Sequence, residues 1–370
     1  MTQTARGLYL HIPFCRQKCR YCDFASYAGK ENQIDRYLTA LEQEASRYRA
    51  ETFHTLYIGG GTPSLLSAAQ LEKVFDLIER HFGKVADFAE STMEANPESL
   101  TAEKLEFLKA RGLNRISMGL QSFQNEVLQR IGRIHNVEQF LRAYQAARRA
   151  GFHNINVDLI AGLPGQSAAQ FTDGLNRLIG LGPEHISVYG LQVEEGTAFA
   201  REGVVADEDL LRAELEQTHR ILESAGFVHY EISNFARPGY ESKHNLNYWQ
   251  NGEYLGLGAA AASYQQGTRR SNTTDLAKYI TCMETGQDPT AFYEKLSGKE
   301  KEGETVLLGL RMLGGVHLTA KQQHLFAREI LDLCARGLVE QNGDLLKLTF
   351  EGMFLANQVF MAFVAPFETV

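Results

Sequence analysis

The stretch Cys15-Arg-Gln-Lys-Cys19-Arg-Tyr-Cys22-Asp-Phe24 places three thiols within eight residues, directly after a short, mostly apolar run at 8–12. Three thiols cannot all pair as disulfides, and thiols this close together suit a soft metal centre, either zinc or an iron–sulfur cluster. The basic side chains between them favour thiolates. Structural zinc sites normally use four protein ligands, and no fourth Cys or His follows at a short spacing. Three cysteines fit a four-iron cubane with one open iron.

The spacing of three residues and then two resembles the signature of the radical S-adenosylmethionine (SAM) superfamily. That resemblance implies a [4Fe-4S] cluster on Cys15, Cys19 and Cys22, whose open iron chelates the amino and carboxylate groups of SAM. One electron from the cluster then breaks the sulfonium bond and gives a 5′-deoxyadenosyl radical. This chemistry belongs to the cofactors, and the protein sets their position and electronics.

The bulk composition indicates a globular protein. With 370 residues the chain suffices for one large domain and a smaller one, and 44% hydrophobic with 22% charged residues excludes gross disorder. A net charge of −8 argues against nucleic acid as the main partner. The sequence shows no run of about 20 apolar residues, no signal peptide and few cysteines. These features together favour the cytoplasm. We expect Cys282 and Cys334, far from the cluster, to be small buried apolar residues.

Six strand-then-helix units without hairpin signals predict a parallel α/β sheet. The expected strands are 8–12, 55–58, 92–95, 115–118, 154–160 and 185–191. The expected helices are 33–48, one from about 67, 102–111, 124–131, 137–150 and 168–179. Distinctive residues follow the strands or lie late in them, and barrels of this kind place their ligands at the carboxyl ends of the strands. The fold class predicted is a partial (β/α)6 barrel of the TIM type.

The remainder of the chain predicts a small second domain. We assign 1–285 to the core, including an extension from about 226, the polar stretch 286–304 to a linker, and 305–370 to the terminal domain. Three expected helices and a hairpin turning at Asn342-Gly343 give the terminal domain a winged-helix-like layout. Because the chain is acidic, we expect this domain to be structural or to bind a protein partner rather than nucleic acid.

Further motifs strengthen the resemblance. They are Tyr9-Leu-His-Ile-Pro-Phe-Cys15, Gly59-Gly-Gly-Thr-Pro63, Glu94-Ala-Asn-Pro97, Ser117-Met-Gly-Leu-Gln121-Ser-Phe and Asp158-Leu-Ile-Ala-Gly-Leu-Pro164. In this order they resemble the oxygen-independent coproporphyrinogen III oxidase family of radical SAM proteins, over nearly the whole chain. The resemblance implies these SAM contacts: Tyr9, Gly60, Gly61, Thr62, Glu94, Gln121, Arg133 and Asp158.

The residue chemistry agrees with those roles, with alternatives. Glycines expose backbone to a ligand, although a triglycine stretch by itself is equally an ordinary turn. Carboxylates such as Glu94 and Asp158 suit a ribose or an amino group, although each also suits a salt bridge at the barrel mouth. The donor fork of Arg133 suits the carboxylate of SAM. No catalytic residue is assigned.

Two features separate the chain from the oxidase itself. The oxidase carries a fourth cysteine two residues after the third, where this chain has Phe24, and a long N-terminal extension, where only eight residues precede Tyr9. The Cys-x-Phe ending and His244-Asn-Leu-Asn-Tyr-Trp249 instead resemble the sister branch, the HemW-type haem chaperones. That resemblance implies haem contacts at His244, Tyr248 and Trp249; without it, a His-Asn pair beside a Trp is more often core or loop structure.

Three functional hypotheses follow. The first is a haem chaperone that binds haem and transfers it to haem proteins, respiratory ones included, with His11 as a second candidate for haem contact. The alternative is oxidative decarboxylation of coproporphyrinogen III, in porphyrin metabolism. The third is a radical SAM enzyme acting on another substrate. The sequence leaves open the haem acceptor, the axial haem ligand, SAM cleavage in the native role, the oligomeric state and peripheral contact with the inner face of a membrane.

Overall fold

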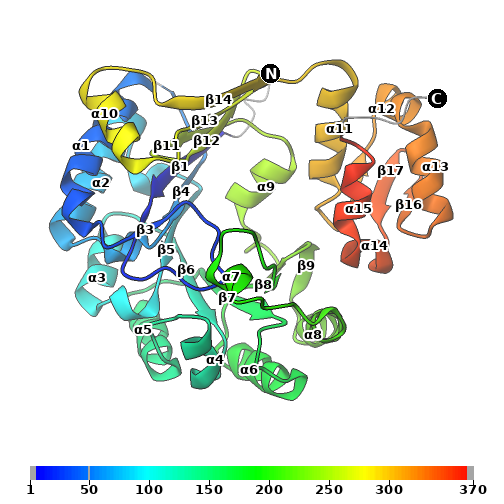
Figure 1. The fold of residues 1–370 in the computed structure, drawn as a ribbon, viewed down its shortest axis with the longest axis horizontal. Helices are drawn as coiled ribbons and strands as arrows, with labels where there is room; N and C mark the ends of the chain where they lie inside the picture. Colours follow the sequence, from blue (N-terminus) through cyan, green and yellow to red (C-terminus); the bar gives the residue numbers. More distant parts are fainter. Residues whose placement is uncertain (1–5, 49–50, 365–370) are drawn as a thin grey trace.

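The computed structural model describes residues 6–48 and 51–364 (Figure 1). Its centre is a twelve-stranded sheet in which six parallel strands follow one another in chain order. They are β1 (Gly7–Ile12), β4 (Thr55–Gly60), β5 (Glu90–Ala95), β6 (Arg115–Gln121), β7 (Ile155–Ala161) and β8 (His185–Gly190). Among the described strands β1 does not pair with β8, so the barrel is open. The predicted partial (β/α)6 barrel is therefore confirmed.

Helices cover the outer face of this sheet (Figure 1). They are α1 (Ile34–Ala45), α2 (Ala68–Phe82), α3 (Ala102–Ala110), α4 (Asn125–Arg130), α5 (Val137–Arg149) and α6 (Ala168–Leu181). Capping boxes at Ser67, Asn136 and Ser167 begin three of them, where the side chain of each cap accepts the amide of the residue three positions later. Each of these three helices turns an apolar stripe towards the strands, which yields one continuous core.

Additional strands extend both edges of the barrel. On one side β11 (Tyr254–Leu257) pairs parallel with β1, and β12 (Ala262–Gln265), β13 (Thr268–Asn272) and β14 (Thr290–Lys295) continue antiparallel. On the other side β10 (Asn234–Ala236) and β9 (Val228–Glu231) follow β8. The helices of this region are α7 (Ala198–Arg201), α8 (Glu208–Ser224), α9 (Lys243–Trp249) and α10 (Leu276–Glu284).

The terminal domain has its own apolar core and lies beside α9 and β9 (Figure 1). Its elements are α11 (Gly298–Gly309), β15 (Val316–His317), α12 (Ala320–Leu325), α13 (Ala327–Ala335), β16 (Val339–Asn342), β17 (Leu345–Leu348), α14 (Phe350–Phe354) and α15 (Ala356–Met361). The order helix, strand, two helices and hairpin, with a three-stranded sheet β15-β17-β16, is the winged-helix-like layout expected.

The stretch 286–304 is not a bare connection. It contains β14 and the first part of α11, although its polar composition predicted a linker. Among the described strands β14 is an edge strand that pairs only with β13, and nearly all its side chains are exposed, so polar residues are compatible with a strand there. The boundaries 1–285, 286–304 and 305–370 stay a prediction.

Candidate functional site

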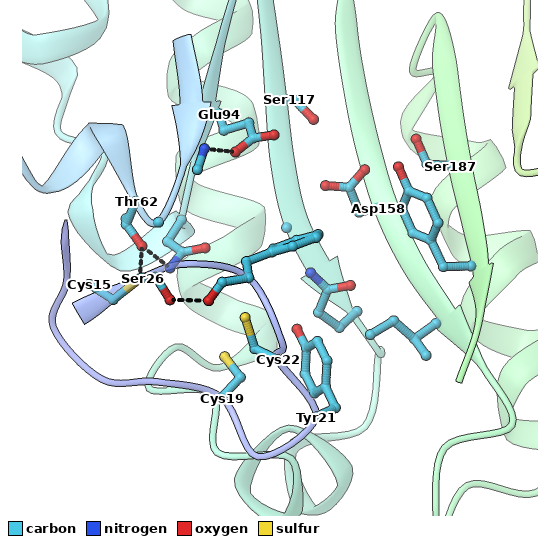
Figure 2. Close-up of a pocket in the computed structure, with 18 of the residues that line it drawn as sticks. Cys15, Cys19, Tyr21, Cys22, Ser26, Thr62, Glu94, Ser117, Asp158 and Ser187 are labelled. Atoms are coloured by element: carbon cyan, nitrogen blue, oxygen red, sulfur yellow. Dashed lines mark hydrogen bonds between the residues drawn. The ribbon is translucent and has the colours of Figure 1, made fainter. Parts of the chain in front are cut away.

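Cys15 ends the short strand β2 (Phe14–Cys15), which follows β1, and Cys19 and Cys22 lie in the loop between β2 and β3 (Tyr27–Ala28). All three are free thiols; Cys15 is buried, whereas Cys19 and Cys22 are partly exposed. Figure 2 shows their sulfur atoms on the same side of a cavity. No three His, Cys, Asp or Glu side chains of the described residues lie close enough to hold a single metal ion. Cluster ligation by Cys15, Cys19 and Cys22 stays a prediction.

The glycine loop after β4 packs directly on this cysteine loop. A Cβ atom on Gly61 would lie 2.7 Å from the carbonyl oxygen of Phe14 and 3.0 Å from Cys15 Sγ, so the close approach requires glycine. Thr62 Oγ1 donates to Cys15 Sγ at 3.5 Å. The loop therefore holds the first thiol in place, and its own amides are bonded to Glu94, Ile12 and Phe14.

Burial outweighs the basic neighbours at two of the cysteines, although Lys18 favours the thiolate of Cys22 as predicted. Burial raises the pKa of Cys15 and of Cys22 above the ordinary thiol value. Lys18 donates to the carbonyl oxygen of Phe24 at 2.9 Å, and Arg20 pairs with Glu202. Burial outweighs these solvent-exposed charges, so a bound metal must itself displace the thiol protons.

A cavity of about 410 Å³ adjoins the three thiols (Figure 2). Seven of the eight predicted SAM contacts line it together with the cysteines: Gly60, Gly61, Thr62, Glu94, Gln121, Arg133 and Asp158. Tyr9 is the exception, because it lines a second cavity. The predicted residues come from the carboxyl ends of four neighbouring strands and from the segment after α4, and the barrel brings them together.

Arg133 joins the cysteine loop to the strands. Its guanidinium donates to Asn96 Oδ1 and to the carbonyl oxygen of Gly119, both at 2.6 Å, and to Cys19 Sγ at 3.7 Å. Gln121 has a left-handed φ of 73°, at a bulge where the pairing of β6 with β7 shifts between Gly119 and Gln121. Such a bulge re-aims a side chain, here one that lines the cavity.

The two carboxylates lie across the cavity from the thiols (Figure 2). Glu94 accepts from the amide of Gly60 and from Tyr57 Oη, both at 2.9 Å, and burial raises its pKa to about 7. Asp158 accepts from Asn156 Nδ2 at 2.7 Å, and burial also raises its pKa. Neither carboxylate forms an ion pair with a described residue, so the salt-bridge alternative has no support here. Both carboxylates remain suited to an amino group or a ribose.

The second cavity, of about 910 Å³, lies between the barrel, α9 and α11. Tyr9 and His11 of β1 line it; Tyr9 Oη contacts His11 Nδ1 at 2.8 Å, and His11 Nε2 contacts the carbonyl oxygen of Ala25 at 2.9 Å. Some residues line both cavities: Phe24, Tyr57, Gly60, Glu94, Tyr189 and Asn245. The two cavities therefore share a wall, and Phe24 stands in it.

Comparison with known proteins agrees with this geometry. Residues 9–178 match the Radical SAM superfamily. The protein named Heme chaperone HemW in Bacillus subtilis is 39% identical, over 97% of this chain and 99% of its own length. Its namesake in Lactococcus lactis is 36% identical, over 98% of each chain. The chain belongs to the HemW family of radical SAM proteins.

The solved structure of the Escherichia coli coproporphyrinogen III oxidase HemN, a radical SAM enzyme, superposes with a TM-score of 0.86. That protein is 26% identical and the match covers 98% of this chain and 91% of the oxidase. The HemW-family fold of this chain is therefore that of the oxidase, as the sequence predicted. None of the helices within 6–48 and 51–364 is long and apolar enough to cross a membrane.

In this HemW-family chain the motif 244–249 forms α9. His244 has no exposed surface; its Nδ1 contacts Thr55 Oγ1 and its Nε2 contacts Tyr248 Oη, both at 2.8 Å. Its ring stacks on Tyr57 with centroids 5.2 Å apart, and burial lowers its pKa to about 3. Both nitrogens are thus engaged, whereas Tyr248 and Trp249 line the second cavity beside it.

Sequence reasoning missed a layer of buried polar residues inside the barrel. His185 Nδ1 contacts Asn156 Oδ1 at 2.6 Å, its Nε2 contacts Tyr230 Oη at 2.8 Å, and Arg115 lies nearby in the same cavity wall. A signal was present: polar residues recur at alternate strand positions, which point into a barrel. These pairs are Arg115 and Ser117, Asn156 and Asp158, and His185 and Ser187.

Proposed function

We propose that this chain is a haem chaperone that carries a [4Fe-4S] cluster and SAM, binds haem, and transfers it to haem-dependent proteins, respiratory ones among them. The observation that carries the proposal is the second cavity, which adjoins the cluster cavity and is lined by the residues predicted to contact haem. The relatives in Bacillus subtilis and Lactococcus lactis, both named Heme chaperone HemW, support it. A cytoplasmic location fits thiols that must stay reduced to bind iron.

The residues of the first cavity fit the two cofactors. Cys15, Cys19 and Cys22 would hold the cluster, and the cradle formed by Gly61 keeps backbone close to it. Arg133 would bind the carboxylate of SAM, and Glu94 with Asp158 would bind its amino group or ribose. When both are bound, the cluster supplies one electron to SAM. The protein positions the two and encloses them in a buried site.

The second cavity suits a flat, mostly apolar ligand. Its volume lies near the upper end of the range of about 300–1,000 Å³ found for ligand sites. Aromatic and aliphatic side chains line it: Phe24, Tyr189, Trp249, Leu307 and Leu308. Phe24 is 66% exposed, an unusual position for a large apolar side chain unless a ligand or partner covers it. It occupies the position where the oxidase family carries its fourth cysteine.

His244 serves in this proposal as a positioning residue. Ligation of haem iron by Nε2 would require the loss of its contact with Tyr248, and the ring is held between Thr55 and Tyr57. We therefore assign haem contact to Tyr248 and Trp249, and we assign to His244 the task of fixing α9 under them.

The test is an anaerobic haem titration of the full chain with reconstituted cluster, read by the Soret band. It is followed by transfer of the bound haem to the apo form of a respiratory haem protein. We expect saturable 1:1 binding and a transfer rate that exceeds spontaneous haem release. In His244→Gln the Soret maximum should stay at its wild-type position while affinity falls. A shifted maximum would identify His244 as an axial ligand, and absence of saturable binding in the wild type would overturn the chaperone assignment.

The alternative is tested with the same preparation. The likeness to the Escherichia coli oxidase makes anaerobic decarboxylation of coproporphyrinogen III, with SAM and a reductant, the relevant assay. We expect no conversion above that of a Cys15→Ala variant. Stoichiometric conversion to protoporphyrinogen IX would replace the chaperone by the oxidase.

A further inference from the structure

The second cavity has one polar end, and its polar atoms are not satisfied by the protein. Four buried atoms there have no hydrogen-bond partner among the described residues: Trp249 Nε1, Arg311 Nε, Glu231 Oε2 and Asn234 Oδ1. All four residues line this cavity. Because native structures leave few buried polar atoms unpaired, four around one cavity indicate that a polar ligand group belongs there.

Arg311 is the cation at this end. It follows α11, and its guanidinium lies over the indole of Trp249, with 4.2 Å from Cζ to the ring centroid. The nearest acid is Glu231, whose Oε2 is 3.8 Å from a guanidinium nitrogen, too far for a hydrogen bond. The Arg311 side chain is 26% exposed and that of Glu231 is fully buried. The guanidinium therefore keeps its donors while a neighbouring carboxylate balances its charge.

The other arginine of the cavity differs. Arg269 donates to Tyr254 Oη at 3.2 Å, to Asn251 Oδ1 at 2.9 Å, and to Glu304. Its donors are committed to joining β13 to β11, to α11 and to the turn after α9. Of the two, Arg311 is the one able to bind an anionic ligand.

We propose that Arg311, which lies over the indole of Trp249, binds a carboxylate of the ligand in the second cavity. This inference rests on the function proposed above, so the carboxylate is a propionate of haem. A guanidinium matches a carboxylate with two parallel hydrogen bonds. The macrocycle then lies along the aromatic wall towards Phe24. Glu231 balances the positive charge of Arg311 when no ligand is present and competes with the propionate for the guanidinium.

The contact also reaches the junction of the two domains. The carbonyl oxygen of Arg311 accepts from the amide of Ile232 at 3.2 Å, and the amide of Leu313 donates to the carbonyl oxygen of Tyr230 at 3.1 Å. Glu231 forms an isolated antiparallel bridge with Met312. A ligand held by Arg311 is thus held where the terminal domain joins the edge of the barrel.

The experiment compares haem with haem dimethyl ester, in which both propionates are uncharged. Trp249 is the single tryptophan of the chain, so quenching of its emission reports binding, and the Arg311 variant tests whether the ligand lies in this cavity. In the full, cluster-loaded chain we expect haem to bind about tenfold more tightly than the ester, and Arg311→Met to bring the two affinities together. Arg177→Met, which also removes an arginine stacked on an aromatic ring but outside both cavities, should keep the wild-type ratio.

A second variant tests the competitor. Glu231→Gln keeps an acceptor for Asn234 and removes the negative charge beside Arg311, so haem should bind several-fold more tightly while the ester is unaffected. The proposal is overturned if Arg311→Met retains the wild-type preference for haem, or if the wild type binds haem and ester equally. Absence of saturable haem binding in the wild type would instead overturn the function itself.

Discussion

The carboxylate of Glu90, at the start of β5, accepts a hydrogen bond from the backbone amide of His244 at 3.0 Å. The same carboxylate accepts from the amide of Lys243 at 2.9 Å and from Ser242 Oγ at 3.1 Å. The first amides of a helix have no partner inside it, so Glu90 supplies the acceptors that α9 lacks. This buried contact fastens α9 to the barrel and thereby places Tyr248 and Trp249 at the second cavity.

Replacing Glu90 should loosen α9. Glu90→Ala leaves buried amides without acceptors and should lower the free energy of unfolding by about 2–3 kcal/mol, while Glu90→Gln, which keeps one oxygen, should cost less. Urea unfolding measures both. Haem affinity should fall in the same order, and a stable Glu90→Ala chain with wild-type affinity would contradict this account. Glu106→Ala, at an exposed site on α3, is the control and should change stability by less than about 0.5 kcal/mol.

The cluster should depend on the three clustered thiols alone. Alanine at Cys15, Cys19 or Cys22 should abolish assembly of the iron–sulfur cluster, because three ligands leave none in reserve. Iron and acid-labile sulfide per chain, after anaerobic reconstitution, measure this. Cys282→Ala, in the buried face of α10, should retain a full cluster and lose only about 1 kcal/mol of stability. Full iron content in any of the first three variants would show that another ligand replaces the thiol.

Affinity for SAM should rise with pH through neutrality. Burial raises the pKa of Glu94 to about 7, so the carboxylate is largely protonated at pH 6 and largely ionised at pH 8. An ionised Glu94 is a stronger hydrogen-bond acceptor for the amino N–H groups or the ribose hydroxyls of SAM than a protonated one. Calorimetric titration of the cluster-loaded chain with SAM should show this increase, and Glu94→Gln should flatten it. An equal slope in the variant would assign the pH dependence to another group.

The same shift has a consequence for stability. In the unfolded chain Glu94 loses its proton near its ordinary pKa of 4.5, whereas in the folded chain it keeps the proton up to about 7. Between these values the folded state binds more protons than the unfolded state. The stabilisation that protonated Glu94 contributes is therefore fully present below pH 4.5 and is lost as pH rises to about 7. Unfolding of wild type and Glu94→Gln across this window should converge towards low pH, and a constant difference between them would contradict the shift.

Phe24 should contribute to haem binding and hardly to folding. Its side chain is 66% exposed and lines both cavities, so Phe24→Ala should leave thermal stability unchanged and weaken haem binding several-fold. Phe292→Ala, at a residue 50% exposed on β14, is the matched control and should leave haem affinity unchanged. Equal haem affinity in both variants would remove Phe24 from the proposed site.

Much of this protein could be predicted from sequence because spacing, hydrophobic period and helix caps are features of single segments. The positions of Cys15, Cys19 and Cys22 are set by spacing along one loop, and the barrel strands and helices follow from hydrophobic period and from caps such as Ser67. The residues after each strand could be assigned to one site because parallel strands end at the same edge of a sheet. The polar composition of 286–304 predicted a linker, but the segment contains β14. Its residues are polar because the strand is exposed.

The tertiary structure decided what depends on neighbours distant in sequence. It showed that burial raises the pKa of Cys15 and outweighs the effect of Lys18 on the pKa of Cys22, since desolvation depends on everything packed around a group. It engaged both nitrogens of His244 with Thr55 and Tyr248, so ligation of haem iron by this residue would have to replace one of these contacts. It also placed Arg311, which follows α11, over Trp249 of α9. A spacing rule describes one segment, whereas a cavity is formed by several segments that meet only when the chain folds.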